Sequence, residues 1–176
     1  RLECESALSA GVNMILDPGT MLGNAIAGFT SVRGRSHTFD SRADGYARGE
    51  AIDALSCSLT EEAAVARLLG SAVRQDGRSA SLTAPSGQAQ QGLLSASIAD
   101  ARLLADSIGA LEAHGTGTAL GDPIEAGALN AIFLAQRSAT DPLLVSSLKA
   151  NSGHKEPGAG LAGALKLVME LRDATM

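Results

Sequence analysis

The chain has 176 residues, enough for a single domain with its own hydrophobic core. Its formal net charge is −5 at pH 7, only 2% of its residues are aromatic, and it has no basic stripe, which argues against nucleic acid as a partner. Hydrophobic residues amount to 45% and Trp is absent, so the core has to be built from Ala, Leu, Val, Ile and Gly, as in closely layered α/β proteins.

The sequence indicates neither a metal site nor a membrane span. Cys4 and Cys57 lack any CxxC spacing, so neither a disulfide framework nor a zinc site is suggested. The least charged stretch, 7–32, is interrupted by Asp17, Pro18 and several glycines and does not have the pattern of a membrane span. We therefore expect no metal and no membrane contact.

The first half of the chain is predicted to form two strands joined by irregular segments. The apolar run ALSAGVNMI, 7–15, is followed by an Asp-Pro-Gly turn and is typical of a buried strand. A glycine-rich connection through Gly28 and a polar loop, 33–50, lead to a second, loosely alternating strand over 51–59.

The next segment has two interpretations. Helix propensity favours a helix over 61–69 with Thr60 as its N-cap. The apolar pattern of 64–73, taken alone, fits a helix or a strand.

Helices and strands alternate in the second half of the chain. Helical spacing predicts helices over 88–104, 124–136 and 158–171, the second of which opens with a proline at a first-turn position. Short apolar runs predict strands over 108–113 and 143–148. This alternation predicts an α/β fold, and no linker divides the chain.

The informative residues follow the two strands predicted in the second half. They lie in EAHGTGTALGDPIE, 112–125, and SLKANSGHKEPGAG, 147–160. Loops at the carboxyl ends of strands form the ligand crevice of α/β sheets, so we expect these two to meet. The first loop carries His114, and the second carries His154 and Lys149. Two imidazoles beside an ammonium group suit the polarisation of a carbonyl or the stabilisation of an enolate.

Five blocks of this sequence occur in an order that resembles one enzyme family. The segment 112–125 closely resembles the HGTGT-x-LGDPIE signature of type I polyketide ketosynthases (β-ketoacyl synthases), and 149–160 resembles their K-x-N-x-GH-x-E motif. The other matching blocks are AGVN (10–13), FDSRADGYARGE (39–50) and SAVRQDGRSASLTAPSG (71–87). Animal-type fatty acid synthases are near relatives that these motifs do not separate clearly.

The resemblance implies a thiolase-like layered α/β fold (αβαβα), present in part. Residues 1–176 would be a partial ketosynthase domain that covers the end of the N-terminal half and most of the C-terminal half. The segment with the nucleophilic cysteine would lie upstream and the glycine-rich oxyanion segment downstream, and neither Cys4 nor Cys57 stands at the nucleophile's place. In this fold 64–73 would be a strand.

The resemblance also implies a decarboxylative Claisen condensation of acyl and malonyl-type thioesters in polyketide or fatty acid biosynthesis. His114 and His154 would be catalytic, donating hydrogen bonds to the extender thioester oxygen as enolate charge develops. Lys149 would be the third catalytic residue and would position His154 and Glu156 in a charged network, with Asn151 also in support.

The partners implied by the resemblance are an acyl carrier protein and the thioesters that it delivers. Thr116 and Thr118 would contact the phosphopantetheine arm, which the carrier protein brings, and no cofactor is bound by the domain itself. A homodimer is implied for the parent protein, without nucleic acid or membrane.

Plainer interpretations remain for several residues. Lys149 could be a simple salt-bridge partner, Glu156 a stabiliser of a helix's first turn, and Thr116 and Thr118 fillers of a tight turn. Two other carboxylates are interpreted as stabilisers of a helix N-terminus, Asp122 and Glu125. The alternative function is a non-catalytic ketosynthase-like or chain-length-factor-type domain that acts in dimerisation and carrier docking.

Overall fold

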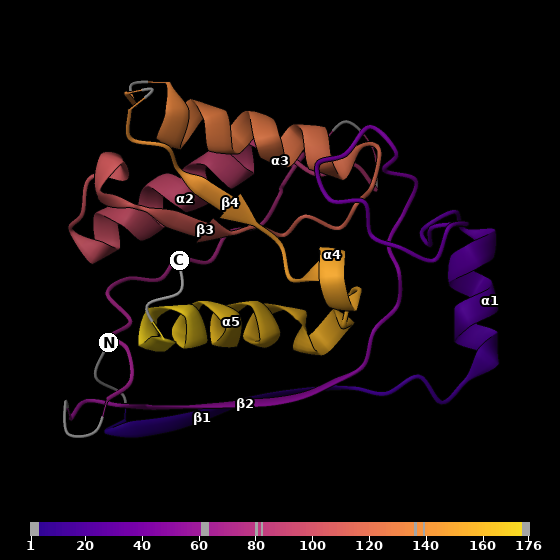
Figure 1. The fold of residues 1–176 in the computed structure, drawn as a ribbon, viewed down its shortest axis with the longest axis horizontal. Helices are drawn as coiled ribbons and strands as arrows, with labels where there is room; N and C mark the ends of the chain where they lie inside the picture. Colours follow the sequence, from indigo (N-terminus) through magenta and orange to yellow (C-terminus); the bar gives the residue numbers. More distant parts are fainter. Residues whose placement is uncertain are drawn as a thin grey trace.

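The computed structural model describes residues 4–60, 64–79, 81, 83–135, 137–138 and 140–173. Within these residues the strands form two separate pairs (Figure 1). β1 (Ser6–Asn13) runs antiparallel to β2 (Ala51–Ser58), and β3 (Ala110–Glu112) runs parallel to β4 (Leu144–Ser146). All four strands fall inside or beside the predicted ranges, so their positions are confirmed. The expectation of a buried strand over 7–15 is wrong, because most of β1 is exposed, with Leu8 73% and Val12 52% exposed.

The three helices predicted in the second half are also confirmed. They are α2 (Gly87–Ala101), α3 (Gly121–Leu129), which continues as a π-helical turn η2 (Asn130–Leu134), and α5 (Ala159–Asp173). Shorter elements complete the second half: η1 (Ala105–Ser107), α4 (Lys149–Ser152) and η3 (Glu156–Gly158). None of the described helices has the length and apolar character needed to cross a membrane.

A first helix, α1 (Pro18–Ile26), lies where a glycine-rich connection was predicted, and that prediction was wrong. Asp17 is its N-cap: the carboxylate accepts hydrogen bonds from the amides of Gly19 at 3.0 Å and Thr20 at 2.8 Å. Pro18 occupies the first turn, where its missing N–H costs no hydrogen bond. The Asp-Pro pair was therefore a helix start rather than only a turn.

The segment 64–73 forms neither the helix nor the strand that were considered for it, and residues 61–63 of the proposed helix lie outside the described residues. Leu68 and Val73 are 80% and 97% exposed. An extended segment becomes a strand only when a neighbouring strand pairs with its backbone, and no strand in the described part of the chain pairs with this one. Its anchor is instead a hydrogen bond from the Ser71 amide to the Asp100 carboxylate of α2, at 2.9 Å.

Helix α5 lies between the two strand pairs, and α3, which packs against α2, lies on the side of β3–β4 away from α5 (Figure 1). Glycines at and just before the start of α5 allow close contacts. A Cβ on Gly163 would lie 2.9 Å from Cγ of Glu112, and one on Gly158 would lie 3.0 Å from Cβ of Ala51. The buried apolar residues are mostly small, and they come chiefly from α3, η2 and α5: Ala84, Ala113, Ala128, Leu129, Phe133 and Ala162.

Gly11 of β1 offers a test of this close layering. A Cβ there would lie 2.9 Å from both Cα of Gly158 and the carbonyl oxygen of Pro157, which are backbone atoms that cannot move aside alone. We expect Gly11→Ala to lower the free energy of unfolding by about 1–3 kcal/mol. The matched control is Gly23→Ala on α1, where a Cβ meets nothing within 4 Å and better helix propensity should leave stability unchanged or higher. Urea titrations of the protein that carries this chain measure both, and equal effects would contradict the expectation.

Candidate active site

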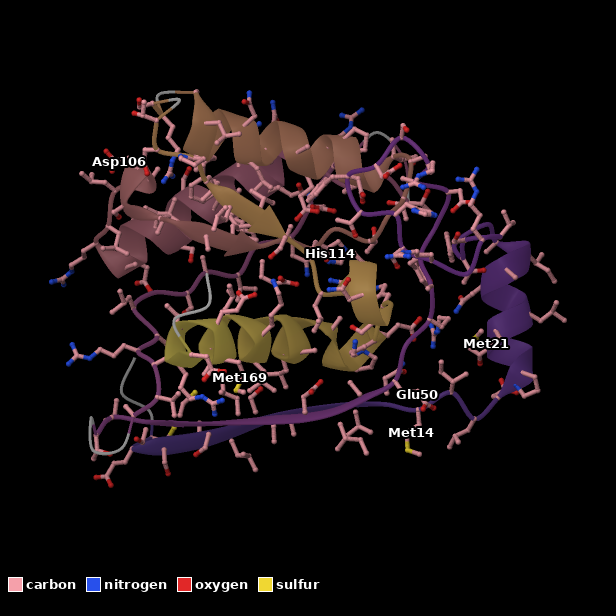
Figure 2. All side chains as sticks on the ribbon, in the orientation of Figure 1. Met14, Met21, Glu50, Asp106, His114 and Met169 are labelled. Atoms are coloured by element: carbon pink, nitrogen blue, oxygen red, sulfur yellow. The ribbon has the colours of Figure 1, made fainter. Side chains whose placement is uncertain are left out.

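The parallel pairing of β3 and β4 brings the two motif loops to one edge. Glu112 and Ser146, the last residues of the strands, are register partners, and the Ala113 amide donates to the Ser146 carbonyl at 2.7 Å. The loops that follow place His114 and His154 side by side, with ring centroids 5.9 Å apart and planes at 87°. Figure 2 shows His114 near the centre of the molecule, beside the end of β4 and α4. The expected meeting of the two loops is confirmed.

Glu125 of α3 holds the backbone of the His114 loop. One carboxylate oxygen accepts a hydrogen bond from the His114 amide at 2.6 Å, and the other accepts one from the Gly115 amide at 2.7 Å. The carboxylate thus binds the loop in a bidentate manner and fixes the position from which the His114 side chain starts.

Asp122, one turn earlier on α3, binds the next part of the same loop. It is only 3% exposed, and its carboxylate accepts hydrogen bonds from the amides of Gly117 at 3.0 Å and Phe39 at 2.8 Å. The interpretation of Asp122 and Glu125 as mere helix stabilisers therefore misses their main contacts. Their i, i+3 spacing, which puts both on one face of the helix, was the available signal.

His154 is held on its backbone side by the segment 45–50. The His154 amide donates to the Ala47 carbonyl at 2.6 Å, and the Gly49 amide donates to the His154 carbonyl at 3.0 Å. The ring of Tyr46 meets the imidazole edge-on, with centroids 5.0 Å apart. Sequence reasoning included Tyr46 only within the block 39–50, because nothing in the local pattern shows that this loop pairs with a segment about 100 residues away.

The hydrogen bond at Nδ1 of His154 fixes the tautomer of the ring. The Glu156 backbone amide donates to Nδ1 at 3.2 Å. A backbone N–H can only donate, so Nδ1 is the acceptor and the proton of the neutral imidazole sits on Nε2. His154 therefore presents an N–H donor on the side of the ring away from Glu156.

Both imidazoles are neutral at neutral pH. Burial, then the charge of Lys149, then His114 lower the pKa of His154 to about 4, with smaller contributions from Arg48 and Lys155. Burial and Lys149 also lower the pKa of His114, although the residue keeps part of its surface in solvent. Neutral rings can donate a hydrogen bond without being strong acids.

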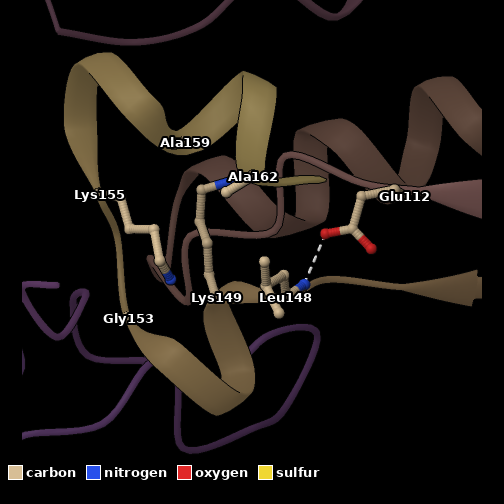
Figure 3. Close-up of a pocket in the computed structure, with 7 residues that line it drawn as sticks. All are labelled: Glu112, Leu148, Lys149, Gly153, Lys155, Ala159 and Ala162. Carbon is tan, nitrogen blue, oxygen red and sulfur yellow. Dashed lines mark hydrogen bonds between the residues drawn. The ribbon is translucent and has the colours of Figure 1, made fainter. Parts of the chain in front are cut away.

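Lys149 is buried at the start of α4, in a small hollow that includes Glu112 and Lys155 (Figure 3). Burial lowers the pKa of its ammonium, and the negative charges of Glu112 and Glu125 oppose this shift. Among the described residues no hydrogen bond or ion pair joins Lys149 to His154 or Glu156. Its influence on the imidazoles is through charge rather than contact.

The other predicted site residues are Glu156, Asn151, Thr116 and Thr118, and the first two do not have the contacts expected of them. The side chain of Glu156 pairs with Arg48, not with Lys149, and Asn151 is exposed on α4. A hollow of about 610 Å³ opens beside His114, and its walls include Thr116 and Thr118. The two hydroxyls lie 3.2 Å apart, and that of Thr118 also accepts a hydrogen bond from the Gly121 amide, so this residue fills a turn and faces the hollow at once.

The two cysteines lie away from this site. Cys57 lies on β2, opposite Ala7 and six positions from Ala51. Ala51 marks the end of β2 that is near the site: its register partner Asn13 donates a hydrogen bond to the Gly49 carbonyl, beside His154. Six residues of extended strand span roughly 20 Å. Cys4 precedes the same end of β1, and both cysteines are exposed.

Comparison with known proteins identifies the class that this fold and site define. Residues 65–176 match the model of the β-ketoacyl synthase C-terminal domain, and residues 1–63 match that of the N-terminal domain. The chain therefore belongs to the β-ketoacyl synthase family.

The relatives are polyketide synthases. The chain is 41% identical, over 97% of its length, to a phenolphthiocerol/phthiocerol polyketide synthase of Mycobacterium tuberculosis. It is 43% identical, over 96% of its length, to highly reducing polyketide synthase alnA of Emericella nidulans. These matches cover 8% and 7% of the relatives, so the chain spans less than a tenth of their length.

Solved ketosynthase structures agree with this assignment and show the thiolase-like fold. The ketosynthase from module 6 of the bacillaene synthase of Bacillus subtilis superposes with a TM-score of 0.89 at 32% identity, covering 96% of this chain and 31% of that one. The oxazolomycin ketosynthase domain OzmH KS7 of Streptomyces albus gives 0.89 at 33% identity, covering 97% and 31%. The chain is thus a ketosynthase sequence of the type I polyketide synthase kind and corresponds to about a third of such a domain.

The lowered pKa of His154 predicts a pH dependence of folding stability. The unfolded ring takes up a proton near pH 6.5, whereas the folded ring stays neutral down to about 4, so this contribution to stability is complete above pH 6.5 and is lost as the pH falls toward 4. We expect His154→Gln to lose less stability than the wild type between pH 7 and 4.5. Thermal melts at fixed pH measure this, and parallel pH profiles of the two proteins would refute it.

Proposed function

We propose that this chain supplies the decarboxylation half of a ketosynthase active site. The observation that carries the proposal is the pair of neutral imidazoles in edge-to-face contact, one of them at the wall of a hollow. A malonyl-type thioester would enter this hollow. The bond between the α-carbon and the terminal carboxylate breaks, and carbon dioxide leaves. The electron pair of that bond stays on the α-carbon and is delocalised onto the thioester oxygen as an enolate. The enolate carbon then attacks an acyl thioester on a cysteine, whose thiolate departs.

The role of the two histidines is to donate hydrogen bonds to the thioester oxygen as it gains charge. The Nε2–H of His154 is the donor that its tautomer leaves free, and an N–H of His114 is the second. Pre-positioned donors at a developing oxyanion contribute about 2.7–4 kcal/mol each. A neutral donor is suited to this task because an imidazolium would tend to protonate the carbanion before it could attack.

Lys149 assists through its charge. A buried ammonium close to both imidazoles lowers their pKa values and creates a positive potential where the enolate forms. We assign Lys149 this electrostatic role in place of a hydrogen-bonded network with Glu156.

The substrates would arrive on an acyl carrier protein. Thr116 and Thr118 face the hollow beside His114 and are placed to contact a phosphopantetheine arm. The nucleophilic cysteine would come from another segment of the protein, and a homodimer is the expected assembly.

Removal of either histidine tests the proposal. In the protein that carries this chain, we expect His114→Ala and His154→Ala each to lower malonyl decarboxylation by about 100-fold or more, because a donor to the enolate is lost. Release of labelled carbon dioxide from malonyl carrier protein is the measurement. The control is His37→Ala, in the loop 33–50, which we expect to retain activity. Release at the wild-type rate from His114→Ala would remove His114 from its assigned role.

The cysteine assignment has its own test. We expect a cerulenin-type inhibitor to leave Cys4 and Cys57 unlabelled. Cys57 lies six strand residues, roughly 20 Å, along β2 from Ala51, and a thiol needs a base within hydrogen-bond reach to be activated. Peptide mapping by mass spectrometry after inhibition locates the modified residue. An acyl or inhibitor adduct at either cysteine would show that the nucleophile lies within this chain.

A further inference from the structure

We propose that Arg48 is a positioning residue that fixes the tautomer of His154 through Glu156. The inference rests on the proposed function, since it concerns how one of the two donors is held. Arg48 touches no reacting atom; it acts through an ion pair with the Glu156 carboxylate, and the Glu156 backbone amide in turn touches Nδ1 of His154.

The first observation is the backbone conformation of Glu156. Its φ is +43°, in the left-handed region that residues with a side chain rarely adopt. This φ sets the direction of the Glu156 side chain relative to its own peptide plane, and the amide in that plane donates to Nδ1 of a histidine only two residues earlier. A residue held in an unfavourable conformation needs a contact elsewhere that maintains it.

Arg48 supplies that contact. Its side chain is only 6% exposed, and its guanidinium forms an ion pair with the Glu156 carboxylate. Within the described residues the buried Nε of Arg48 has no hydrogen-bond partner, so neighbouring groups do not hold the guanidinium from that side. Among the described residues, Glu156 is the anionic partner of this buried guanidinium, and a buried cation depends strongly on such a partner.

The same segment also holds the backbone of His154. The residues on either side of Arg48 exchange hydrogen bonds with His154: its amide donates to Ala47, and the Gly49 amide donates to its carbonyl. The segment 45–50 thus fixes the backbone position of His154. Through Arg48 it also holds Glu156, whose amide donates the hydrogen bond to Nδ1. Loss of the pair would leave the ring in place but free its tautomer.

Kinetics of the protein that carries this chain test the inference. We expect Arg48→Met and Glu156→Ala each to lower kcat for malonyl decarboxylation by about 10- to 100-fold, with KM for malonyl carrier protein changed by less than about threefold. The double variant should be no worse than either single one, because both remove the same pair. Glu156→Gln, which keeps an oxygen acceptor for the guanidinium but not the charge, should lose less activity than Glu156→Ala.

A matched control exists in the same loop. Arg42 forms an ion pair with Asp40 at 2.7 Å, and the Arg42 side chain is 61% exposed, against 6% for Arg48. Arg42→Met should leave decarboxylation unchanged. An equal loss in Arg42→Met and Arg48→Met would overturn the inference, since the effect would then be that of any arginine removed from this loop.

Two readouts separate positioning from general destabilisation. Nitrogen-15 chemical shifts of labelled histidine should show His154 as the Nε2–H tautomer in the wild type and as a mixture in Arg48→Met. Glycine adopts a positive φ without strain, so Arg48→Met/Glu156→Gly should be at least about threefold more active than Arg48→Met/Glu156→Ala. An unchanged tautomer in Arg48→Met, or no rescue by glycine, would refute the inference, and the second comparison stands even if Arg48→Met alone folds poorly.

Failure of this inference can be told apart from failure of the proposed function. If His154→Ala decarboxylates at the wild-type rate, the donor role of His154 is wrong and the inference fails with it. If His154→Ala is inactive while Arg48→Met and Glu156→Ala are fully active, the proposed function stands and only the role of Arg48 is wrong.

Discussion

The parallel pairing of β3 with β4 is the constraint on which the site depends. Each strand has only three residues, so the pairing itself contributes few hydrogen bonds, and side chains have to reinforce it. Glu112, at the end of β3, does this by crossing to the other strand: its carboxylate accepts from the Leu148 amide at 2.5 Å and from the Lys166 ammonium of α5 at 2.7 Å. One buried carboxylate therefore ties together β3, the residue before Lys149, and the central helix.

Carboxylates bound to backbone amides recur throughout the site. Asp122 and Glu125 accept hydrogen bonds from backbone amides of the His114 loop, and Glu112 accepts one from the Leu148 amide, just before α4. Loops without regular secondary structure leave their amides unpaired, and an ionised carboxylate is the strongest side-chain acceptor available to them. The acidic residues of the motif thus shape the loops, and the histidines are the groups that we propose to face a substrate.

Local pattern predicted the strands, the three later helices and the convergence of the two loops, because each depends on residues that are close in sequence or on one pairing of parallel strands. Local pattern did not predict structure or contacts that depend on residues far away in the sequence. The segment 64–73 is apolar enough for a strand but pairs with none in the described part of the chain. Tyr46 and Arg48 contact His154 and Glu156 from across the fold, and no spacing within 39–50 reveals this. The helix α1 was missed for a different reason: its Asp-Pro start was interpreted only as a turn.

The charges around the histidines suit enolate chemistry in two ways that are linked. Lys149 lies near both rings, and Arg48 and Lys155 lie near His154; each positive charge disfavours a proton on an imidazole. The same positive potential favours an anion on a thioester bound beside the rings. A site that lowers the pKa of its histidines by desolvation alone would also disfavour the enolate, because burial penalises any charge. In the proposed mechanism buried cations offset this conflict, since they add to burial in keeping the donors neutral and also stabilise the negative charge of the enolate.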